Sequence, residues 1–284
     1  MSIRSRIIYL GKGLNIYLTR KGSPIQSDCF SRTSVPPPFD QLITVTSPSS
    51  DYFFDVYNRD DIAYGMEPSA ALEAFLKQAA RNGGKAVDLG AGAGRDSIAL
   101  ALAGYDVTSV DLSDRGLARI AERASEYQVS DRVRTQLCDV RQFEFLARSF
   151  DAVIATTVLD HIPAADAETV WQRMCDSLTD SGMIYVQVHT TEDPGCDQLP
   201  GRDRDAPVSE TADAVINYFR PNQLAAWAVA AKSRLRILRY EERLEWDYTH
   251  GSEHQHGKAV LLAVRQGYHP DWFGQPPAFP QRKS

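Results

Sequence analysis

One segment carries most of the information about this chain: Lys85-Ala86-Val87-Asp88-Leu89-Gly90-Ala91-Gly92-Ala93-Gly94-Arg95-Asp96-Ser97. The apolar residues up to Leu89 predict a buried strand, and the alternating glycines predict a turn that opens a helix. Glycines let the backbone approach a ligand closely, and the first N–H groups of the helix point at that ligand. Asp88 adds a carboxylate that can order the turn and hold a cationic amino group, whereas it would repel a pyrophosphate.

A second acidic residue, Asp111, follows the next expected strand, 106–110, and stands 21 residues after Gly90. Its carboxylate is placed to accept hydrogen bonds from both hydroxyls of a ribose, as acidic residues do about 20 positions on in nucleotide-binding folds. A capping or turn aspartate fits the same position equally well.

A third acidic residue, Asp139, ends the strand expected over 133–138. An oxygen there can accept a hydrogen bond from an adenine amino group, and the neighbouring Val140 can pack on the ring. The next strand, 150–155, runs through Thr156 into a loop that would form the floor of a pocket. Each residue alone also fits an ordinary strand end, but their order and spacing together do not.

The rest of the chain alternates strand and helix patterns, which predicts a parallel sheet with helices on its faces. We expect helices over 69–81, 95–103 and 164–179, one capped by Ser113 with Leu117, Ile120, Ala121 and Ala124 on one face, and one with Pro221 in its first turn. We expect strands over 85–89, 106–110, 133–138, 150–155, 183–189, 234–244 as an edge strand and 259–264 as a central strand.

Residues 85–190 resemble class I S-adenosylmethionine (SAM) dependent methyltransferases. Asp88-Leu89-Gly90 through Ser97, with Gly104-Tyr105-Asp106-Val107 and Asp111, most resemble the tellurite-resistance methyltransferase family. The resemblance implies an α/β, Rossmann-like three-layer sandwich whose seven-stranded, mostly parallel sheet has the order 3-2-1-4-5-7-6, with strand 7 antiparallel. It is thin after His189, and the first 50 residues have no counterpart.

Carried over by position, the resemblance implies SAM as cofactor and a role for each matching residue. Gly90, Gly92 and Gly94 would line the methionine portion, Asp111 would lie on the ribose, Asp139 near the adenine and Thr156 beside the transferred methyl. Ala91, Leu112 and Val140 are further cofactor-binding candidates. Many relatives have cysteine where this chain has Ala91, a change that should leave cofactor binding intact.

The reaction implied is in-line displacement of the methyl group by a small-molecule acceptor, such as a chalcogen oxyanion, a thiol or another anionic metabolite. A thiolate or a chalcogen lone pair needs no base. A protonated oxygen or nitrogen does, and His161 and His189 are the candidates because both follow strand ends and imidazole titrates near neutrality. A hydrogen-bonded loop histidine is the alternative for each.

A histidine-rich segment, His250-Gly251-Ser252-Glu253-His254-Gln255-His256, joins the last two expected strands. In the implied topology His256 should approach His189, so His250, His254 and His256 are candidates for contact with the substrate. A metal would need three convergent ligands, and we expect none; a solvated hairpin tip is the other alternative. Tyr64 can cap the substrate side of the pocket or simply pack in the core.

Length and composition favour one catalytic domain. The 284 residues carry a net charge of −6, and the central region has no basic cluster, which argues against a nucleic-acid surface. The four cysteines are far apart, so we expect neither disulfides nor a zinc site, and a cytoplasmic location. No apolar run is long enough to span a bilayer.

The sequence also predicts the domain organisation. We expect a disordered or loosely packed extension over 1–50, which we interpret as a leader rather than a targeting signal. The methyltransferase domain is expected over 51–266, with a lid loop at about 190–211, followed by a tail over 267–284.

Two other functions compete with methyl transfer. A nicotinamide-dependent oxidoreductase needs Gly-x-Gly-x-x-Gly or Ala, but Arg95 stands at the last position counted from Gly90, and Ser97 at that counted from Gly92. A non-catalytic SAM-binding protein fits all of the motifs, and only turnover separates it from an enzyme. The oligomeric state is not readable from the sequence.

Overall fold

The computed structural model describes residues 65, 67–78, 83–196, 206–209, 211–248 and 251–270. Several predictions lie outside these residues: the extension over 1–50, the roles of Tyr64 and His250, the middle of the lid loop and most of the tail over 267–284.

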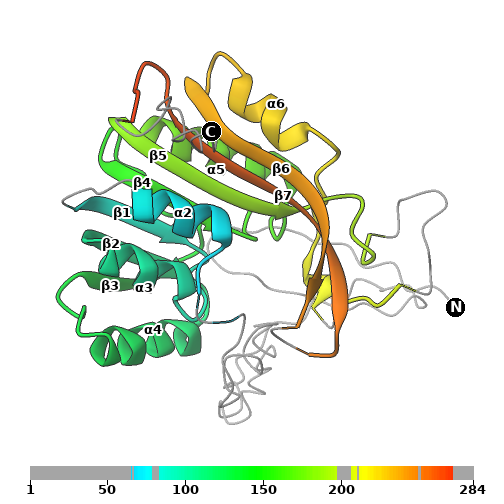
Figure 1. The fold of residues 1–284 in the computed structure, drawn as a ribbon, viewed down its shortest axis with the longest axis horizontal. Helices are drawn as coiled ribbons and strands as arrows, with labels where there is room; N and C mark the ends of the chain where they lie inside the picture. Colours follow the sequence, from blue (N-terminus) through cyan, green and yellow to red (C-terminus); the bar gives the residue numbers. More distant parts are fainter. Residues whose placement is uncertain are drawn as a thin grey trace, which may run out of the picture. The chain divides into compact units, whose positions relative to one another are not determined.

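The described strands form a single seven-stranded sheet in the order β3-β2-β1-β4-β5-β7-β6 (Figure 1). They are β1 (Gly84–Leu89), β2 (Tyr105–Asp111), β3 (Val133–Leu137), β4 (Phe150–Thr156), β5 (Leu178–His189), β6 (Leu235–Asp247) and β7 (His254–Arg265). β7 runs antiparallel to both of its neighbours, β5 and β6, and the other neighbouring pairs are parallel. The expected strand order and the antiparallel strand are confirmed.

Helices cover both faces of this sheet (Figure 1). They are α2 (Ala70–Gln78), α3 (Arg95–Leu102), α4 (Asp114–Glu126), α5 (Ala164–Ser177) and α6 (Gln223–Val229), with a short 3₁₀ helix, η1 (Ala212–Ala214). Leu72 of α2 and Leu100 of α3 are buried against one face, and Trp171 of α5 and Leu224 of α6 against the other. Among the helices of the described residues, none has the length and apolar composition needed to cross a membrane.

Three details differ from the sequence-based expectations. α5 ends at Ser177 and β5 already begins at Leu178, because Leu178 is fully buried in extended conformation and pairs with Phe150. Pro221 precedes α6 instead of lying in its first turn, and Asn222, with φ 63°, is the N-cap. Ala121 is exposed, so the buried stripe of α4 does not include it.

The last two strands form a long hairpin whose members differ in burial. β7 is buried at nearly every position, whereas most β6 residues are partly exposed. The predictions of a central and an edge strand are therefore confirmed. Both strands are longer than expected, and the hairpin ends with Asp247 of β6 paired to His254 of β7.

Candidate active site

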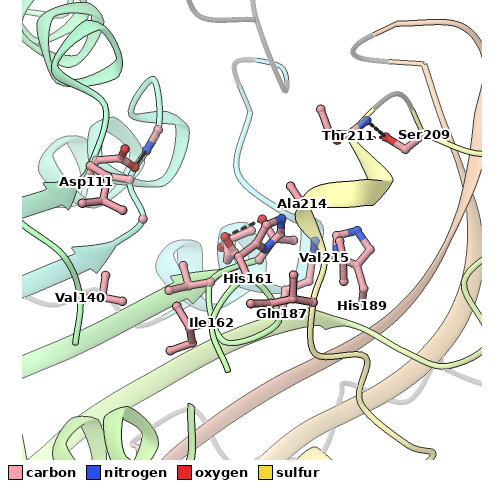
Figure 2. A pocket seen from close by; sticks show the side chains of 18 of the residues that line it. Asp111, Val140, His161, Ile162, Gln187, His189, Ser209, Thr211, Ala214 and Val215 are labelled. Atoms are coloured by element: carbon pink, nitrogen blue, oxygen red, sulfur yellow. Dashed lines mark hydrogen bonds between the residues drawn. The ribbon is translucent and has the colours of Figure 1, made fainter. Parts of the chain in front are cut away.

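A cavity of about 770 Å³ lies at the carboxyl ends of the parallel strands. Figure 2 shows Asp111 and Val140 on one side of it and His189 with Ser209 on the other. We call the first side the glycine end, since the turn after β1 lines it. We call the second the histidine end, which is lined by Thr157, His161, Gln187, His189, Asp193, His256 and Lys258.

The glycine end is built on backbone that only glycine adopts easily. Gly90 and Gly92 have φ values of 61° and 52°. A Cβ on Gly90 would lie 2.5 Å from Cγ2 of Val158. Gly94 (φ 87°) does not line the cavity, and its missing side chain makes room for Ile120 of α4. Two glycines therefore shape the turn, and the third packs α4 against it.

Asp88 lies beneath this turn and is almost completely buried. Its Oδ2 accepts a hydrogen bond of 2.6 Å from the Ser97 hydroxyl. Burial, reinforced by the negative charge of Asp96, raises the pKa of Asp88 to about 8. A cationic ligand group in the glycine end would favour the ionised form of Asp88.

Asp111 ties the end of β2 to the glycine turn. Its Oδ2 accepts a hydrogen bond of 2.7 Å from the Gly92 amide, and its Oδ1 accepts one of 2.7 Å from the Ser113 amide. Two backbone donors fix the carboxylate at the cavity wall, where a ligand hydroxyl could reach it. Leu112, beside it, is 68% exposed at the rim.

The end of β3 supplies the next part of the wall. Asp139 forms a forked ion pair with Arg141, in which Nε donates to Oδ1 at 3.0 Å and Nη2 to Oδ2 at 2.5 Å. Hydrogen bonding to Arg141 lowers the pKa of Asp139. Val140 is buried, and Thr156 lines the same cavity while its hydroxyl donates to Oδ2 of Asp96 at 2.6 Å.

At the histidine end, the fully buried Asp160 lies between two histidines that line the cavity. Its Oδ2 lies 2.5 Å from Nδ1 of His189 and accepts a hydrogen bond of 2.9 Å from the His189 amide. Its Oδ1 lies 3.3 Å from Nδ1 of His161. Burial alone would raise the pKa of Asp160, but the histidines outweigh it and lower that pKa. Burial opposes protonation of His161, yet the Asp160 charge raises the His161 pKa overall.

A second histidine cluster adjoins the first, as the sequence predicted. The rings of His189 and His256 are 4.7 Å apart between centroids. Nδ1 of His256 lies 3.0 Å from Oδ2 of Asp193, which also accepts a hydrogen bond from the Gly257 amide. Nε2 of His256 lies 3.0 Å from Nε2 of His254. His254 itself does not line the cavity.

Sequence reasoning assigned no role to four lining residues of the histidine end, Thr157, Gln187, Asp193 and Lys258, or to the buried Asp160 between its histidines. Asp160 directly precedes His161, a signal that was available. Asp193 lies in a loop without periodicity, and Lys258 interrupts an apolar strand, where its Nζ pairs with Oε1 of Glu245 at 2.7 Å. Only the fold brings these two residues to the cavity.

Comparison with known protein families and sequences agrees with this fold. Residues 86–182 match the family model described as a methyltransferase domain. The chain is 27% identical over 147 residues to a probable SAM-dependent methyltransferase TehB of Haemophilus influenzae, an alignment that covers 51% of this chain and 48% of TehB. It is 33% identical over 84 residues to a 27-O-demethylrifamycin SV methyltransferase of Amycolatopsis mediterranei, covering 29% and 31%. The chain thus spans about half the length of TehB, and less of the second relative.

Solved structures show the same architecture. The crystal structure of TehB from Haemophilus influenzae aligns with a TM-score of 0.55 at 21% identity, over 76% of this chain and 66% of that one. A Burkholderia thailandensis 1,6-didemethyltoxoflavin-N1-methyltransferase, solved with its namesake substrate and S-adenosylhomocysteine, aligns with a TM-score of 0.50 at 22% identity, over 69% and 77%. At these identities the likeness establishes the fold, and the expected family resemblance is confirmed.

Proposed function

We propose that this chain transfers the methyl group of SAM to a small-molecule acceptor, because residues 86–182 match a methyltransferase-domain model and the fold is the one that solved methyltransferases have. The glycine end would hold the methionine and ribose portions, and the histidine end would hold the acceptor. SAM supplies an activated methyl group on a sulfonium sulfur. The chain's own part is to bind and orient both reactants and to exclude water.

One observation carries this proposal: Asp88 and Asp111 stand at the ends of adjacent parallel strands, on the two flanks of one glycine turn. The Asp111 side chain is bonded to the turn through the Gly92 amide, so the carboxylate and the close backbone form one rigid wall. Asp88 is buried under the same wall, where burial and the charge of Asp96 outweigh the opposing effects of Ser97 and Arg95 on its pKa. A ligand with an ammonium group beside Asp88 and a ribose beside Asp111 fits this pair of acidic residues, whereas the Asp111 carboxylate would repel a pyrophosphate.

Calorimetry with SAM and S-adenosylhomocysteine tests the cofactor assignment. We expect both to bind to the wild-type chain, and Asp111→Ala to weaken binding by about 10- to 100-fold, equivalent to about 1.4–2.8 kcal/mol, because a charge-assisted hydrogen-bond pair is lost. Asp106→Ala, an exposed aspartate of β2 remote from the cavity, is the matched control. Absence of binding by the wild-type chain would remove the basis for the proposal.

For the acceptor, we propose a small anionic or polarisable molecule, such as a chalcogen oxyanion or a thiol. Two groups of the histidine end support this. The charge of Asp160 favours a protonated His161, and Lys258 adds a second cation to the lining. A panel of tellurite, selenite, small thiols, amines and carboxylates, followed through release of S-adenosylhomocysteine, identifies the class. Methylation of an amine or carboxylate alone would contradict the proposed acceptor.

If the acceptor has to lose a proton, we propose His189 as the base. The carboxylate of Asp160 accepts the hydrogen on Nδ1 of His189 and thereby leaves Nε2 as the basic atom. His189→Gln should then slow methylation of oxygen or nitrogen acceptors by about 10²- to 10⁴-fold. The same variant should leave turnover of a thiolate within a few-fold. Equal losses for both acceptor types would show that His189 only shapes the cavity.

A different outcome would concern the function itself. No turnover of the wild-type chain with any acceptor, despite tight SAM binding, would favour a SAM-binding sensor instead.

A further inference from the structure

Three side chains of metal-ligating type converge at the end of the β6–β7 hairpin. Asp247 is the last residue of β6, and His254 is the first residue of β7. The two residues lie opposite each other in the strand pairing. His256 follows two residues later on the same face of the strand. Ligand atoms of all three lie within 4.8 Å of one another, and both histidines are buried.

The hydrogen bonds of the two histidines define which ring nitrogen carries hydrogen. Nδ1 of His254 lies 2.6 Å from the carbonyl oxygen of Ser252, which can only accept. Nδ1 of His256 faces the Asp193 carboxylate, which also accepts. Each neutral ring therefore has its hydrogen on Nδ1 and a lone pair on Nε2. The two Nε2 atoms are only 3.0 Å apart, a contact that either a shared proton or a metal ion between them would stabilise.

The spacing of the two Nε2 atoms is compatible with a shared metal ion. Two nitrogen ligands at about 2.0–2.1 Å from a tetrahedral zinc ion are about 3.3 Å apart. The observed 3.0 Å separation of the two Nε2 atoms is close to this value. Oδ2 of Asp247 lies 3.9 Å from Nε2 of His256, somewhat farther apart than two ligand atoms of one zinc ion.

We propose that Asp247, His254 and His256 bind a divalent transition-metal ion such as Zn²⁺ at the wall of the cavity. Two imidazoles and one carboxylate form a ligand set that leaves a coordination position open. Asp193 and the Ser252 carbonyl accept hydrogen bonds from the Nδ1 atoms of His256 and His254. In known metal sites, hydrogen bonds of this kind orient the histidine ligands.

Two neighbouring groups compete with this assignment. Lys258 is a cation at the same place, but its Nζ is 2.7 Å from Glu245 and 3.8 Å from Oδ2 of Asp247, so its hydrogen bond goes to Glu245. His189, Asp193 and His256 form a second convergent set. In that set, however, Oδ2 of Asp193 already accepts hydrogen bonds from His256 and from the Gly257 amide. The set of Asp247, His254 and His256 is therefore the better candidate for binding a metal ion.

The use of such an ion rests on the proposed function. Asp247 and His256 line the cavity, so an ion between them would face the acceptor. Its open position would bind an oxyanion or thiolate of the acceptor and hold that atom for attack on the methyl group.

Cobalt titration of the untagged, full-length chain tests the site without any cofactor. We expect one Co²⁺ per chain to bind saturably and to give the intense visible bands of a low-coordinate site with nitrogen ligands. His254→Gln and Asp247→Asn should each weaken Co²⁺ binding by at least about 10-fold, and Asp193→Asn by about 10- to 100-fold. His269→Gln, an exposed histidine paired with Arg236 outside the cluster, should bind Co²⁺ like the wild type.

Several outcomes would overturn the metal site. One is a wild-type chain without saturable Co²⁺ binding, in which case a shared proton joins the two Nε2 atoms. Another is His254→Gln binding as tightly as the wild type, and a third is loss of the visible bands in His189→Gln but not in His254→Gln. Because His254 is buried, thermal unfolding of each metal-free variant shows whether it is folded, and the partly exposed Asp247 gives a second test.

The two proposals fail separately. His254 does not line the cavity, so His254→Gln should bind S-adenosylhomocysteine with wild-type affinity. Loss of cobalt binding with intact cofactor binding supports the metal site. If the chain binds cobalt but neither SAM nor S-adenosylhomocysteine, this result would support the metal site and contradict the proposed function.

Discussion

Asp88 places a carboxyl group where a negative charge is costly. Below pH 8 the buried carboxyl is mostly protonated, because burial and Asp96 raise its pKa to about 8. An ammonium group bound beside it favours the ionised form. Binding of a ligand with an amino-acid portion should therefore be coupled to loss of a proton from Asp88.

At pH 6.5 we expect binding of S-adenosylhomocysteine to release close to one proton from the wild-type chain. Calorimetry in two buffers of different ionisation enthalpy measures this number directly. Asp88→Asn should release none, while Asp106→Asn at the surface should match the wild type. Identical heats for the wild-type chain in both buffers would contradict the proposed role of Asp88.

Asp160 shows the opposite situation, a buried carboxylate stabilised by two histidines. Its pKa is lowered in the folded chain, so its contribution to stability is present above its unfolded pKa of about 3.9 and is lost as the pH falls. The pKa of His161 is raised, so its contribution is full below about 6.5 and is lost as the pH rises through the folded value.

Asp160→Asn should therefore lower the free energy of unfolding most between about pH 4 and 6.5, by roughly 1–3 kcal/mol. Urea unfolding at a series of pH values measures this difference. The exposed Asp166→Asn should change stability by less than about 0.5 kcal/mol throughout. A loss of stability that is constant with pH would show that the charge of Asp160 plays no part.

At the scale of elements, the contact between α4 and the glycine turn shapes the site. Gly116 lies in the first turn of α4, where its amide donates to the capping Ser113 hydroxyl at 3.2 Å. A Cβ at position 116 would lie 2.7 Å from the carbonyl oxygen of Gly92 and would push the helix away from the turn.

Gly116→Ala should therefore destabilise the fold by about 1–2 kcal/mol, although alanine favours helix, because overpacking against backbone costs more than the propensity gained. It should also weaken cofactor binding about 10-fold. Thermal unfolding and calorimetry measure both effects. Ser125→Ala, an exposed change in the same helix, should be neutral or slightly stabilising. Unchanged cofactor affinity in Gly116→Ala would show that the turn is positioned without α4.

Elements formed by local pattern were largely predictable from the sequence. The glycine turn, the Ser113 cap and the central β7 all follow from residue type and period, and the structure has them. The start of β5 at Leu178 was not predictable, because pairing with Phe150 overrides the helical pattern there. At the site, the glycine end could be expected from neighbouring residues. Asp193 and Lys258 could not, because only long-range pairing brings their segments together.

At the scale of the whole molecule, ligand binding and stability are linked. A ligand at about 100 times its Kd adds about 2.7 kcal/mol to the free energy of unfolding. For a domain of this size that corresponds to a rise in Tm of roughly 5–10 °C. We expect this shift with S-adenosylhomocysteine and none with NAD⁺, measured by scanning calorimetry. A shift with NAD⁺ alone would instead support the oxidoreductase that the glycine spacing disfavours.

The two ends of the cavity come from different segments of the sequence. Every part of the glycine end lies between Asp88 and Val158, within the segment that matches the methyltransferase family. Much of the histidine end comes from 187–258, which lies wholly beyond that segment. Substitutions in the later half of such a chain can change which acceptor is methylated, while the earlier half keeps the residues of the glycine end. A chimera that joins this chain's later half to a relative's earlier half should inherit the acceptor preference of this chain.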